Sequence, residues 1–236
     1  MESSAGERPS WSLCTIDPAN DCQNTHTVIL LHGRDSNCHD SASEFFESEI
    51  PDDLAEVLSR LDTAQSDTVP RPRTFQTLFP SFKWVFPGAN PIPSDRFSTP
   101  LTQWFDIWSV ENPGECPEIQ EAGLRPSVSF VRKVIADESR LVPRNCVYIG
   151  GISQGFVTAV AAYLADVGGI EATPVFLAHA IDDQVVPVQN GRALRDALCN
   201  MDKANVEWHE YEHGGHWITE PEGVDDLVRF IKRTMK

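Results

Sequence analysis

The sequence predicts an α/β protein with a mostly parallel sheet that helices cover on both faces. Five short apolar runs, rich in β-branched or aromatic residues, alternate with longer segments of helical period. The runs are 27–31 (TVILL), 83–86 (KWVF), 146–149 (CVYI), 174–178 (PVFLA) and 206–211 (VEWHEY). The first four are almost continuously hydrophobic, which is typical of parallel strands buried on both faces.

Helices are predicted between and after these strands, at 43–61, 119–141, 153–165, 189–201 and 222–236. In the second of them, Val131, Val134 and Ile135 belong to a stripe with spacings of three and four, as on the core-facing side of a helix. The proline-rich stretches 62–81 and 87–100 are predicted to be long loops, which often border a functional pocket. We expect one domain over 27–236, with 1–26 as an N-terminal extension or an edge strand.

Composition excludes several classes of function. The 236 residues include 19 Lys and Arg against 35 Asp and Glu, a formal charge of −16, which disfavours binding to nucleic acid or to anionic lipid. No apolar run approaches the ~20 residues needed to span a bilayer, and residues 1–11 do not resemble a signal peptide. We therefore expect a cytoplasmic protein without stable membrane insertion.

The six cysteines are scattered through the chain and include no CxxC pair. Such spacing in a chain of this length favours reduced, structural thiols over a disulfide framework. A bridge between Cys14 and Cys22 is the leading alternative.

A candidate nucleophile motif occupies residues 151–155, Gly-Ile-Ser-Gln-Gly. It directly follows the predicted strand 146–149 and precedes a predicted helix, as G-x-S-x-G does where a sharp turn lifts a serine clear of a sheet. The small residues allow close backbone approach, and the helix N-terminus favours the anion that forms during attack. Ser153 is therefore the candidate nucleophile, and the alternative is an ordinary glycine turn.

A serine nucleophile needs a general base and a group that orients the base. Asp183 comes after the strand 174–178 and His216 after the last strand, so both lie at strand ends that border a crevice. The chain order Ser, Asp, His matches one known arrangement of a catalytic triad. Asp182 is the competing acid. The alternative for the two aspartates is a polar turn, and for His216 it is a surface loop.

Residues 209–213 (HEYEH) match the HExxH pattern of zinc proteases. That pattern works on a helix, whereas this segment has strand-like residues and is followed by Gly214-Gly215. On an extended chain His209 and His213 would lie about 13 Å apart, too far to share one metal ion. We therefore predict no metal site here.

The oxyanion of an acyl-transfer reaction needs two backbone donors. The N–H of Gln154, next after the nucleophile, is one candidate, and the N–H of Arg34, after the first recognised strand, is the other. His32 is interpreted as a buried residue that supports this loop rather than as a catalytic group.

Together these residues resemble the phospholipase/carboxylesterase family of α/β-hydrolases, which includes the acyl-protein thioesterases and small carboxylesterases. The matching pieces extend across residues 27–236 and are 30–33 (LLHG), 86–89 (FPGA), 104–107 (WFDI), 151–155 (GISQG), 183–187 (DQVVP) and 211–216 (YEHGGH). G-x-S-Q-G and W-F-D are more specific to this family than G-x-S-x-G is to hydrolases at large.

The resemblance implies a triad of Ser153, Asp183 and His216, with Arg34 and Gln154 supplying the oxyanion hole. It also implies hydrolysis of a carboxylic ester or thioester through an acyl-serine intermediate, without a metal or organic cofactor. The substrate is expected to be a small-molecule ester or an S-acylated protein.

The interval between nucleophile and acid departs from the family pattern. The 30 residues from Ser153 to Asp183 hold one helix and one strand, whereas the family fold places a further strand between these positions. We expect the sheet to lack one strand there. Parallel neighbours lie about 4.8 Å apart, so Asp183 and His216 are expected to shift by up to that distance. In milder departures, Phe156 and Ala180 stand where the family usually has glycine.

Aromatic side chains near the expected crevice, Trp104, Phe105 and Trp217 in particular, are candidates for binding the acyl group. The alternative is that they pack loops against the sheet. A second function also stays open because of the short interval: a catalytically impaired hydrolase-like scaffold that acts as a binding or interaction module. We expect a monomer or a weak homodimer, the latter if the missing strand leaves an unpaired edge.

Overall fold

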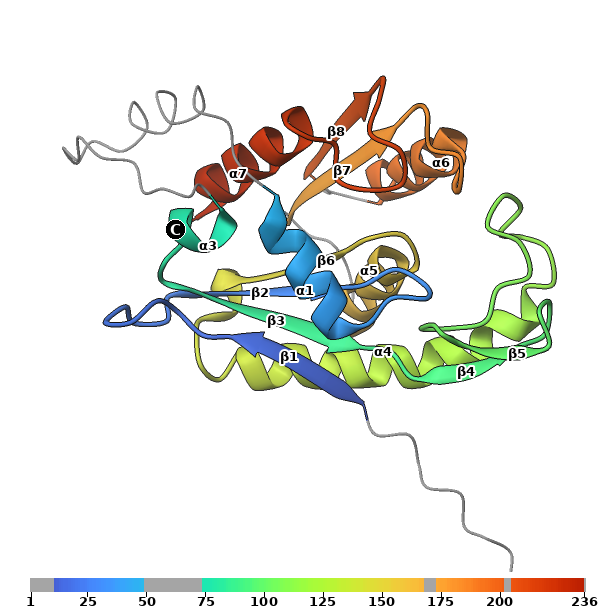
Figure 1. Cartoon of the computed structure of the whole chain (residues 1–236), viewed down its shortest axis with the longest axis horizontal. Helices are drawn as coiled ribbons and strands as arrows, with labels where there is room; N and C mark the ends of the chain where they lie inside the picture. The colour runs from blue at the N-terminus through green and yellow to red at the C-terminus, as the bar shows by residue number, and fades with distance from the viewer. Residues whose placement is uncertain (1–10, 49–73, 168–172, 202–204, 236) are drawn as a thin grey trace, which may run out of the picture.

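A four-stranded sheet forms the centre of the computed structural model, which describes residues 11–48, 74–167, 173–201 and 205–235 (Figure 1). The strand order is β1 (Ser12–Ile16), β3 (Phe82–Gly88), β2 (His26–Leu31) and β6 (Val147–Gly151). β2 pairs in parallel with both β3 and β6, and β1 adds an antiparallel edge. The register ends with Leu31 opposite Gly151, so the segments that follow these two residues lie side by side.

Helices cover both faces of this sheet (Figure 1). Along β2, Val28 packs in one core cluster and Ile29 in the other, because successive side chains of a strand point to opposite faces. The first cluster contains side chains of α1 (Cys38–Glu47), α3 (Phe75–Leu78) and α7 (Glu222–Thr234). The second contains side chains of α4 (Glu118–Glu138) and α5 (Gln154–Val167). Burial on both faces explains why the strand sequences are almost continuously hydrophobic.

A separate sheet consists of β7 (Pro174–Ala180) and β8 (Asn205–Tyr211), which pair in parallel, with α6 (Val188–Cys199) against them. Between Ser153 and β7, the described residues form α5 and no strand. The prediction that one strand is missing is therefore confirmed, and its consequence is a break: β6 has no hydrogen-bonded neighbour on the side away from β2 in the described structure.

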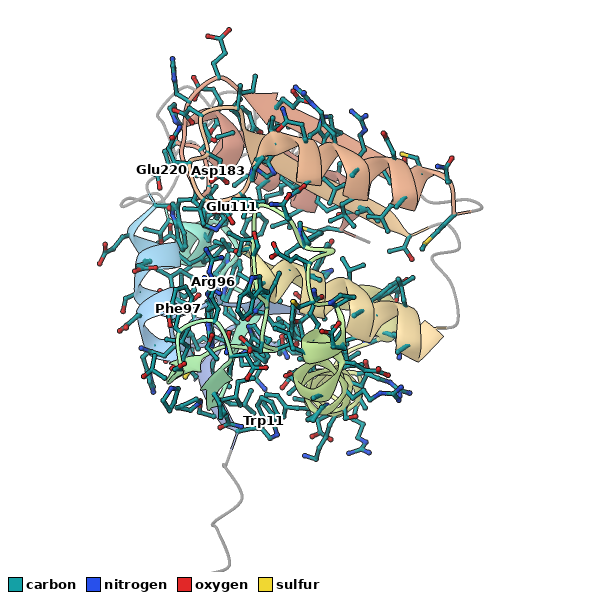
Figure 2. All side chains as sticks on the ribbon, turned by 90° about the vertical axis from the view of Figure 1, so that its right-hand side faces the viewer. Trp11, Arg96, Phe97, Glu111, Asp183 and Glu220 are labelled. Carbon is teal, nitrogen blue, oxygen red and sulfur yellow. The ribbon has the colours of Figure 1, made fainter. Side chains whose placement is uncertain are left out.

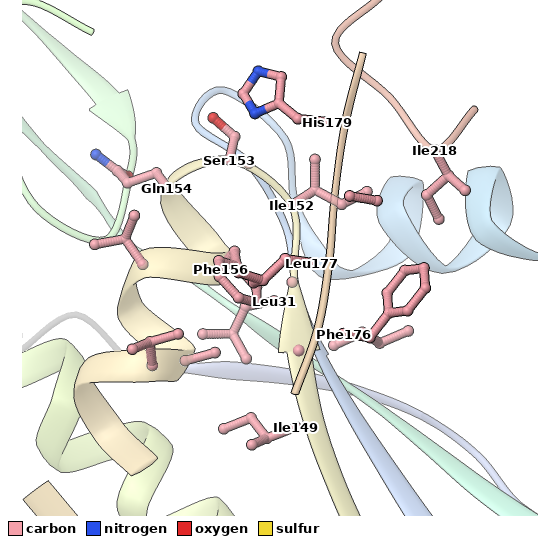
Figure 3. A pocket seen from close by; sticks show the side chains of 18 of the residues that line it. Leu31, Ile149, Ile152, Ser153, Gln154, Phe156, Phe176, Leu177, His179 and Ile218 are labelled. Atoms are coloured by element: carbon pink, nitrogen blue, oxygen red, sulfur yellow. The ribbon is translucent and has the colours of Figure 1, made fainter. Parts of the chain in front are cut away.

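A cavity of about 1460 Å³ extends between β6 and β7 (Figure 3). Its apolar lining includes Val147, Ile149, Val160, Val175, Leu177, Phe230 and Ile231. All five residues of β6 are only partly buried, whereas all but one residue of β2 are fully buried. The missing strand thus leaves an apolar space in what would otherwise be the middle of a sheet.

Among the described residues, side chains rather than strand hydrogen bonds connect the two sheets. Phe176 of β7 packs against the cluster that contains Val228 of α7 and Trp84 of β3. Leu177, on the opposite face of β7, packs in a cluster with Phe156 and other residues of α5. Helices α5 and α7 therefore bridge the break from its two faces.

The five predicted strands are confirmed, and the later four predicted helices are confirmed with small shifts of their ends. The first helix begins earlier than the predicted 43–61, at Cys38, because Asn37 caps it. The Asn37 Oδ1 atom accepts from the His39 and Asp40 amides at 2.9 and 3.0 Å. The portion 49–61 of this prediction lies outside the described residues.

The prediction that 87–100 is a loop is wrong. This stretch completes β3 and then forms most of a two-stranded hairpin of β4 (Pro91–Ser94) and β5 (Thr99–Thr102). In the predicted loop 62–81, α3 occupies 75–78 and β3 begins at Phe82, while residues 62–73 lie outside the described part. An isolated two-stranded ribbon has edges that need no partner, so it tolerates prolines that the centre of a sheet excludes.

All six cysteines are free thiols, so the alternative bridge between Cys14 and Cys22 is absent. None of the helices in the described ranges is long and apolar enough to cross a membrane.

The break in the sheet predicts unequal hydrogen exchange along the strands. We expect peptides covering 147–151 and 174–180 to exchange faster than the peptide covering 27–31, because β2 is paired on both sides whereas β6 and β7 are each paired on one. Exchange followed by mass spectrometry under native conditions measures this directly. Equal protection of β6 and β2 would contradict the break.

Candidate active site

Ser153 lies in a strained turn between β6 and α5. Its φ of +55° is in the left-handed region, which a residue with a Cβ seldom adopts, and strain of this kind concentrates at functional sites. Gly155 makes the turn sterically feasible, since a Cβ there would lie 2.4 Å from the carbonyl oxygens of both Leu31 and His32. The geometry is that of a nucleophile elbow, with Ser153 immediately before the first residue of α5.

Asp183 and His216 form a hydrogen-bonded pair at the ends of β7 and β8. The His216 Nδ1 atom donates to Asp183 Oδ2 at 2.7 Å, and the other carboxylate oxygen accepts from the Val185 and Val186 amides at 2.8 and 2.9 Å. The side chain of Asp183 is only 4% exposed. Burial raises the pKa of this carboxyl, but the hydrogen bonds from His216 and from the two amides outweigh burial, and the net pKa is below its ordinary value.

The competing acid, Asp182, has a different role. It accepts from the Gly215 amide at 2.9 Å and lies 3.4 Å from His213, whose side chain is 87% exposed. Asp182 therefore ties together the loops that follow β7 and β8, while its neighbour Asp183 contacts His216.

Ser153 and His216 line the same cavity, but no hydrogen bond joins them in the part of the chain that the structure describes. The reason is the break in the sheet: Ser153 follows β6 of the larger sheet, whereas Asp183 and His216 follow the strands of the smaller one. In Figure 2, Asp183 lies in the upper part of the molecule, above Arg96 and Phe97 of the loop between β4 and β5. Catalytic hydrogen bonds are often long in a protein without substrate.

The predicted oxyanion donors lie beside the nucleophile. Neither the N–H of Arg34 nor that of Gln154 donates to another described residue, so both are available to an oxyanion. The first N–H groups of a helix have no partner within the helix, which applies to Gln154 at the start of α5. Figure 3 shows Ser153, Gln154 and His179 at one end of the cavity and Ile149 at the other.

Side chains of this region hold the turn in place. The amide group of Gln154 accepts from the Trp104 N–H at 2.8 Å and donates to the Phe105 carbonyl at 2.7 Å. His32 is buried and supports its loop, as expected: its Nδ1 lies 2.6 Å from the Gly33 carbonyl and its Nε2 accepts from the Ala89 amide at 2.9 Å. Burial lowers the pKa of His32 and so favours the neutral ring.

The candidate acyl-binding aromatics divide into two groups. Phe105 and Trp217 line the cavity. Trp104 does not line it: the side chain is 0% exposed, stacks near Trp11 and donates from Nε1 to the His32 carbonyl at 2.8 Å. Trp104 therefore acts in packing, which corrects its assignment to substrate binding.

The W-F-D motif is explained by Asp106, which the sequence analysis did not single out. Its carboxylate accepts from the Asp95 amide at 2.7 Å, from the Ile107 amide at 3.0 Å and from the Gln103 side chain at 3.3 Å. These bonds join the hairpin loop to the segment that holds Gln154. The signal for this role in the sequence was an acidic residue between hydrophobic residues.

His179 is another residue to which motif reasoning gave no role. Its Nε2 atom lies 2.9 Å from the Val186 carbonyl oxygen and 3.3 Å from Asp183 Oδ2. The available signal was a histidine four residues before the acid, at the end of the preceding strand.

The HExxH match does not form a metal site. His209 lies in β8, where Nε2 contacts Glu207 at 2.9 Å and Nδ1 contacts Asp226 at 3.1 Å, while His213 lies in the following loop beside Asp182. Across the described residues, no group of three or more His, Cys, Asp or Glu side chains is arranged to hold a metal ion.

Comparison with protein families supports the reading of fold and motifs. The phospholipase/carboxylesterase family matches residues 62–169, and the prolyl oligopeptidase family matches residues 153–236, a range that contains Ser153, Asp183 and His216. These matches confirm the resemblance to the phospholipase/carboxylesterase family. The chain thus has an α/β-hydrolase fold and resembles that family.

The individual relatives include acyl-protein thioesterases. The chain is 29% identical to acyl-protein thioesterase 1 of Yarrowia lipolytica over 65% of this chain and 78% of that protein. It is 24% identical to acyl-protein thioesterase 1 of Gibberella zeae over 90% and 92%. The crystal structure of Zea mays acyl-protein thioesterase 2 superposes with a TM-score of 0.69 and 19% identity, covering 94% of this chain and 98% of that one, which shows the shared fold.

The environment of Asp183 predicts a pH-dependent contribution to stability. Because its pKa is lowered by folding, the ionised group stabilises the fold above about pH 4, and the contribution is lost as the pH falls through the lowered pKa. We expect Asp183→Asn to reduce the free energy of unfolding by about 2 kcal/mol at pH 7 and by much less at pH 3. Denaturant unfolding at the two pH values measures the difference. A penalty independent of pH would contradict this view of the carboxylate.

Proposed function

We propose that the protein is a serine hydrolase that cleaves carboxylic esters or thioesters through an acyl-serine intermediate on Ser153. The observation that supports this most strongly is the hydrogen bond of 2.7 Å between His216 and the buried Asp183, beside a cavity that also contains the strained Ser153. The names of the relatives, acyl-protein thioesterases and a carboxylesterase, support the same reaction class.

In this proposal Ser153 Oγ attacks the carbonyl carbon of the substrate while His216 Nε2 takes the hydroxyl proton. Asp183 holds the ring with Nδ1–H toward itself and stabilises the imidazolium that forms. The N–H groups of Gln154 and Arg34 receive the negative charge of the tetrahedral intermediate. His216 then returns the proton to the departing alcohol or thiol. Water next attacks the acyl carbon while giving a proton to His216, and Ser153 Oγ leaves with that proton as the carboxylic acid is released.

Proton transfer requires Ser153 Oγ and His216 Nε2 to come within hydrogen-bonding distance of about 3 Å. In the reactive geometry these two side chains, which follow strands on either side of the break between β6 and β7, approach each other. Helices α5 and α7 contact both sheets through side chains, so such a movement breaks no backbone hydrogen bond between strands.

The lining of the cavity favours substrates with an apolar acyl group. Phe105 and Trp217 lie near the catalytic end, and valine, isoleucine and leucine side chains continue along β6 and β7. A small ester or an S-acylated protein fits this chemistry, and the formal charge of −16 disfavours nucleic acid. We further propose that the protein acts in the cytoplasm as a monomer or weak homodimer.

A fluorophosphonate probe is expected to label the wild-type protein covalently at Ser153, because an activated serine attacks the phosphorus centre. Ser153→Ala should abolish labelling, and peptide mass spectrometry should locate the adduct on Ser153. Absence of labelling on folded wild-type protein would support the non-catalytic scaffold and reject the enzyme.

Turnover is expected to depend on acyl chain length. Each further methylene buried in the cavity contributes about 0.8 kcal/mol, so kcat/KM should rise roughly three- to fourfold per methylene until the cavity is filled. p-Nitrophenyl esters and matched thioesters of graded length test this, with Ser153→Ala as the control, for which we expect a loss of at least about 1,000-fold. A flat profile at the level of Ser153→Ala would contradict the proposal.

A further inference from the structure

The carboxylate of Asp183 contacts a second histidine in addition to His216. His179 is the sixth residue of β7, and its side chain is 13% exposed. Its Nε2 atom lies 3.3 Å from Asp183 Oδ2, the same oxygen that accepts from His216 Nδ1 at 2.7 Å. The two rings therefore share one carboxylate oxygen, while the loop amides occupy the other.

The partners of His179 fix the position of its proton. Besides Asp183, the Nε2 atom lies 2.9 Å from the carbonyl oxygen of Val186. A carbonyl oxygen can only accept, so Nε2 carries the hydrogen and His179 donates it to Val186, while Asp183 Oδ2 lies in close polar contact at 3.3 Å. This single N–H joins the end of β7 to the loop that carries Asp183.

A glycine in α6 provides the space for this ring. A Cβ at Gly191 would lie 2.5 Å from His179 Nδ1 and 3.0 Å from the Trp208 ring, so any other residue would push the imidazole away. Glycine inside a helix costs about 1 kcal/mol relative to alanine. The close contact with His179 gives a reason for glycine at this position.

We propose that His179, seated against Gly191, is a positioning residue that holds the Asp183 carboxylate toward His216. This inference rests on the proposed function, because the pair it aligns is the catalytic acid and base of that proposal. His179 acts through Asp183 and does not itself transfer a proton to the substrate. Without its N–H, the Val186 carbonyl loses its link to β7, and the loop whose Val185 and Val186 amides donate to Asp183 is held less firmly.

Three variants test this role in p-nitrophenyl acetate hydrolysis. His179→Phe keeps a ring but removes the donor, and Gly191→Ala keeps the donor but displaces the ring. We expect each to lower kcat by about 10- to 100-fold with little change in KM, since small misplacement of a catalytic group has effects of this size. His179→Gln, whose amide can donate, should recover part of the loss.

Normalisation to the folded protein separates positioning from simple destabilisation. A purely structural role would lower the amount of folded protein and leave kcat per folded molecule unchanged.

His213→Gln is the matched control, because His213 contacts the neighbouring Asp182 at 3.4 Å but is exposed. Its kcat should equal that of the wild type. The inference is overturned if His179→Phe or Gly191→Ala retains wild-type kcat per folded molecule, or if His179→Gln is no better than His179→Phe.

A readout without turnover distinguishes this inference from the proposed function. Long-range ¹H–¹⁵N NMR of the wild-type protein should show His179 as the Nε2–H tautomer, and Gly191→Ala should perturb its signals. An Nδ1–H tautomer would overturn the positioning role even in an active enzyme. If the Nε2–H tautomer is found but no serine reacts with fluorophosphonate, it is the proposed function that fails.

Discussion

No ladder of backbone hydrogen bonds joins β6 to β7 in the described structure, and this break governs the arrangement of the site. Paired strands are held about 4.8 Å apart by regular hydrogen bonds, whereas packed side chains allow sliding. The pairing of β2 with β6 fixes Ser153 relative to the loop that carries Arg34. The pairing of β7 with β8 fixes Asp183 relative to His216. Each half of the site is therefore well defined, and their mutual position depends on side-chain packing.

Each half is also complete in its local chemistry. Gly155 allows the strained turn at Ser153, and Gln154 ties that turn to the segment containing Trp104. In the other half, Asp183 accepts hydrogen bonds from its own loop as well as from His216. The hydrogen bonds within each half are therefore formed. Across the break, no hydrogen bond joins Ser153 to His216 in the described structure.

The sequence predicted those features that short motifs or regular periodicity determine. The five core strands, the turn at Ser153 and the lost strand followed from hydrophobic runs, from G-x-S-Q-G and from the short interval to Asp183. The hairpin at 91–102 was missed because its prolines indicate loops in the absence of tertiary context. The packing role of Trp104 was not assigned, since burial of one aromatic depends on contacts with Trp11 and the loop after His32. The role of His179 was not predicted because it depends on a three-dimensional contact with Asp183.

The cavity between β6 and β7 has a consequence for ligand binding. Its walls belong to both sheets, so an apolar molecule that fills it would contact the nucleophile-bearing half and the base-bearing half at once. Burial of such a molecule would contribute to its affinity, and it would also favour a particular distance between the two halves. In an uninterrupted sheet the protein alone sets that distance. Here the bound molecule would complete the missing layer of the core and so become part of the framework that aligns the reacting groups.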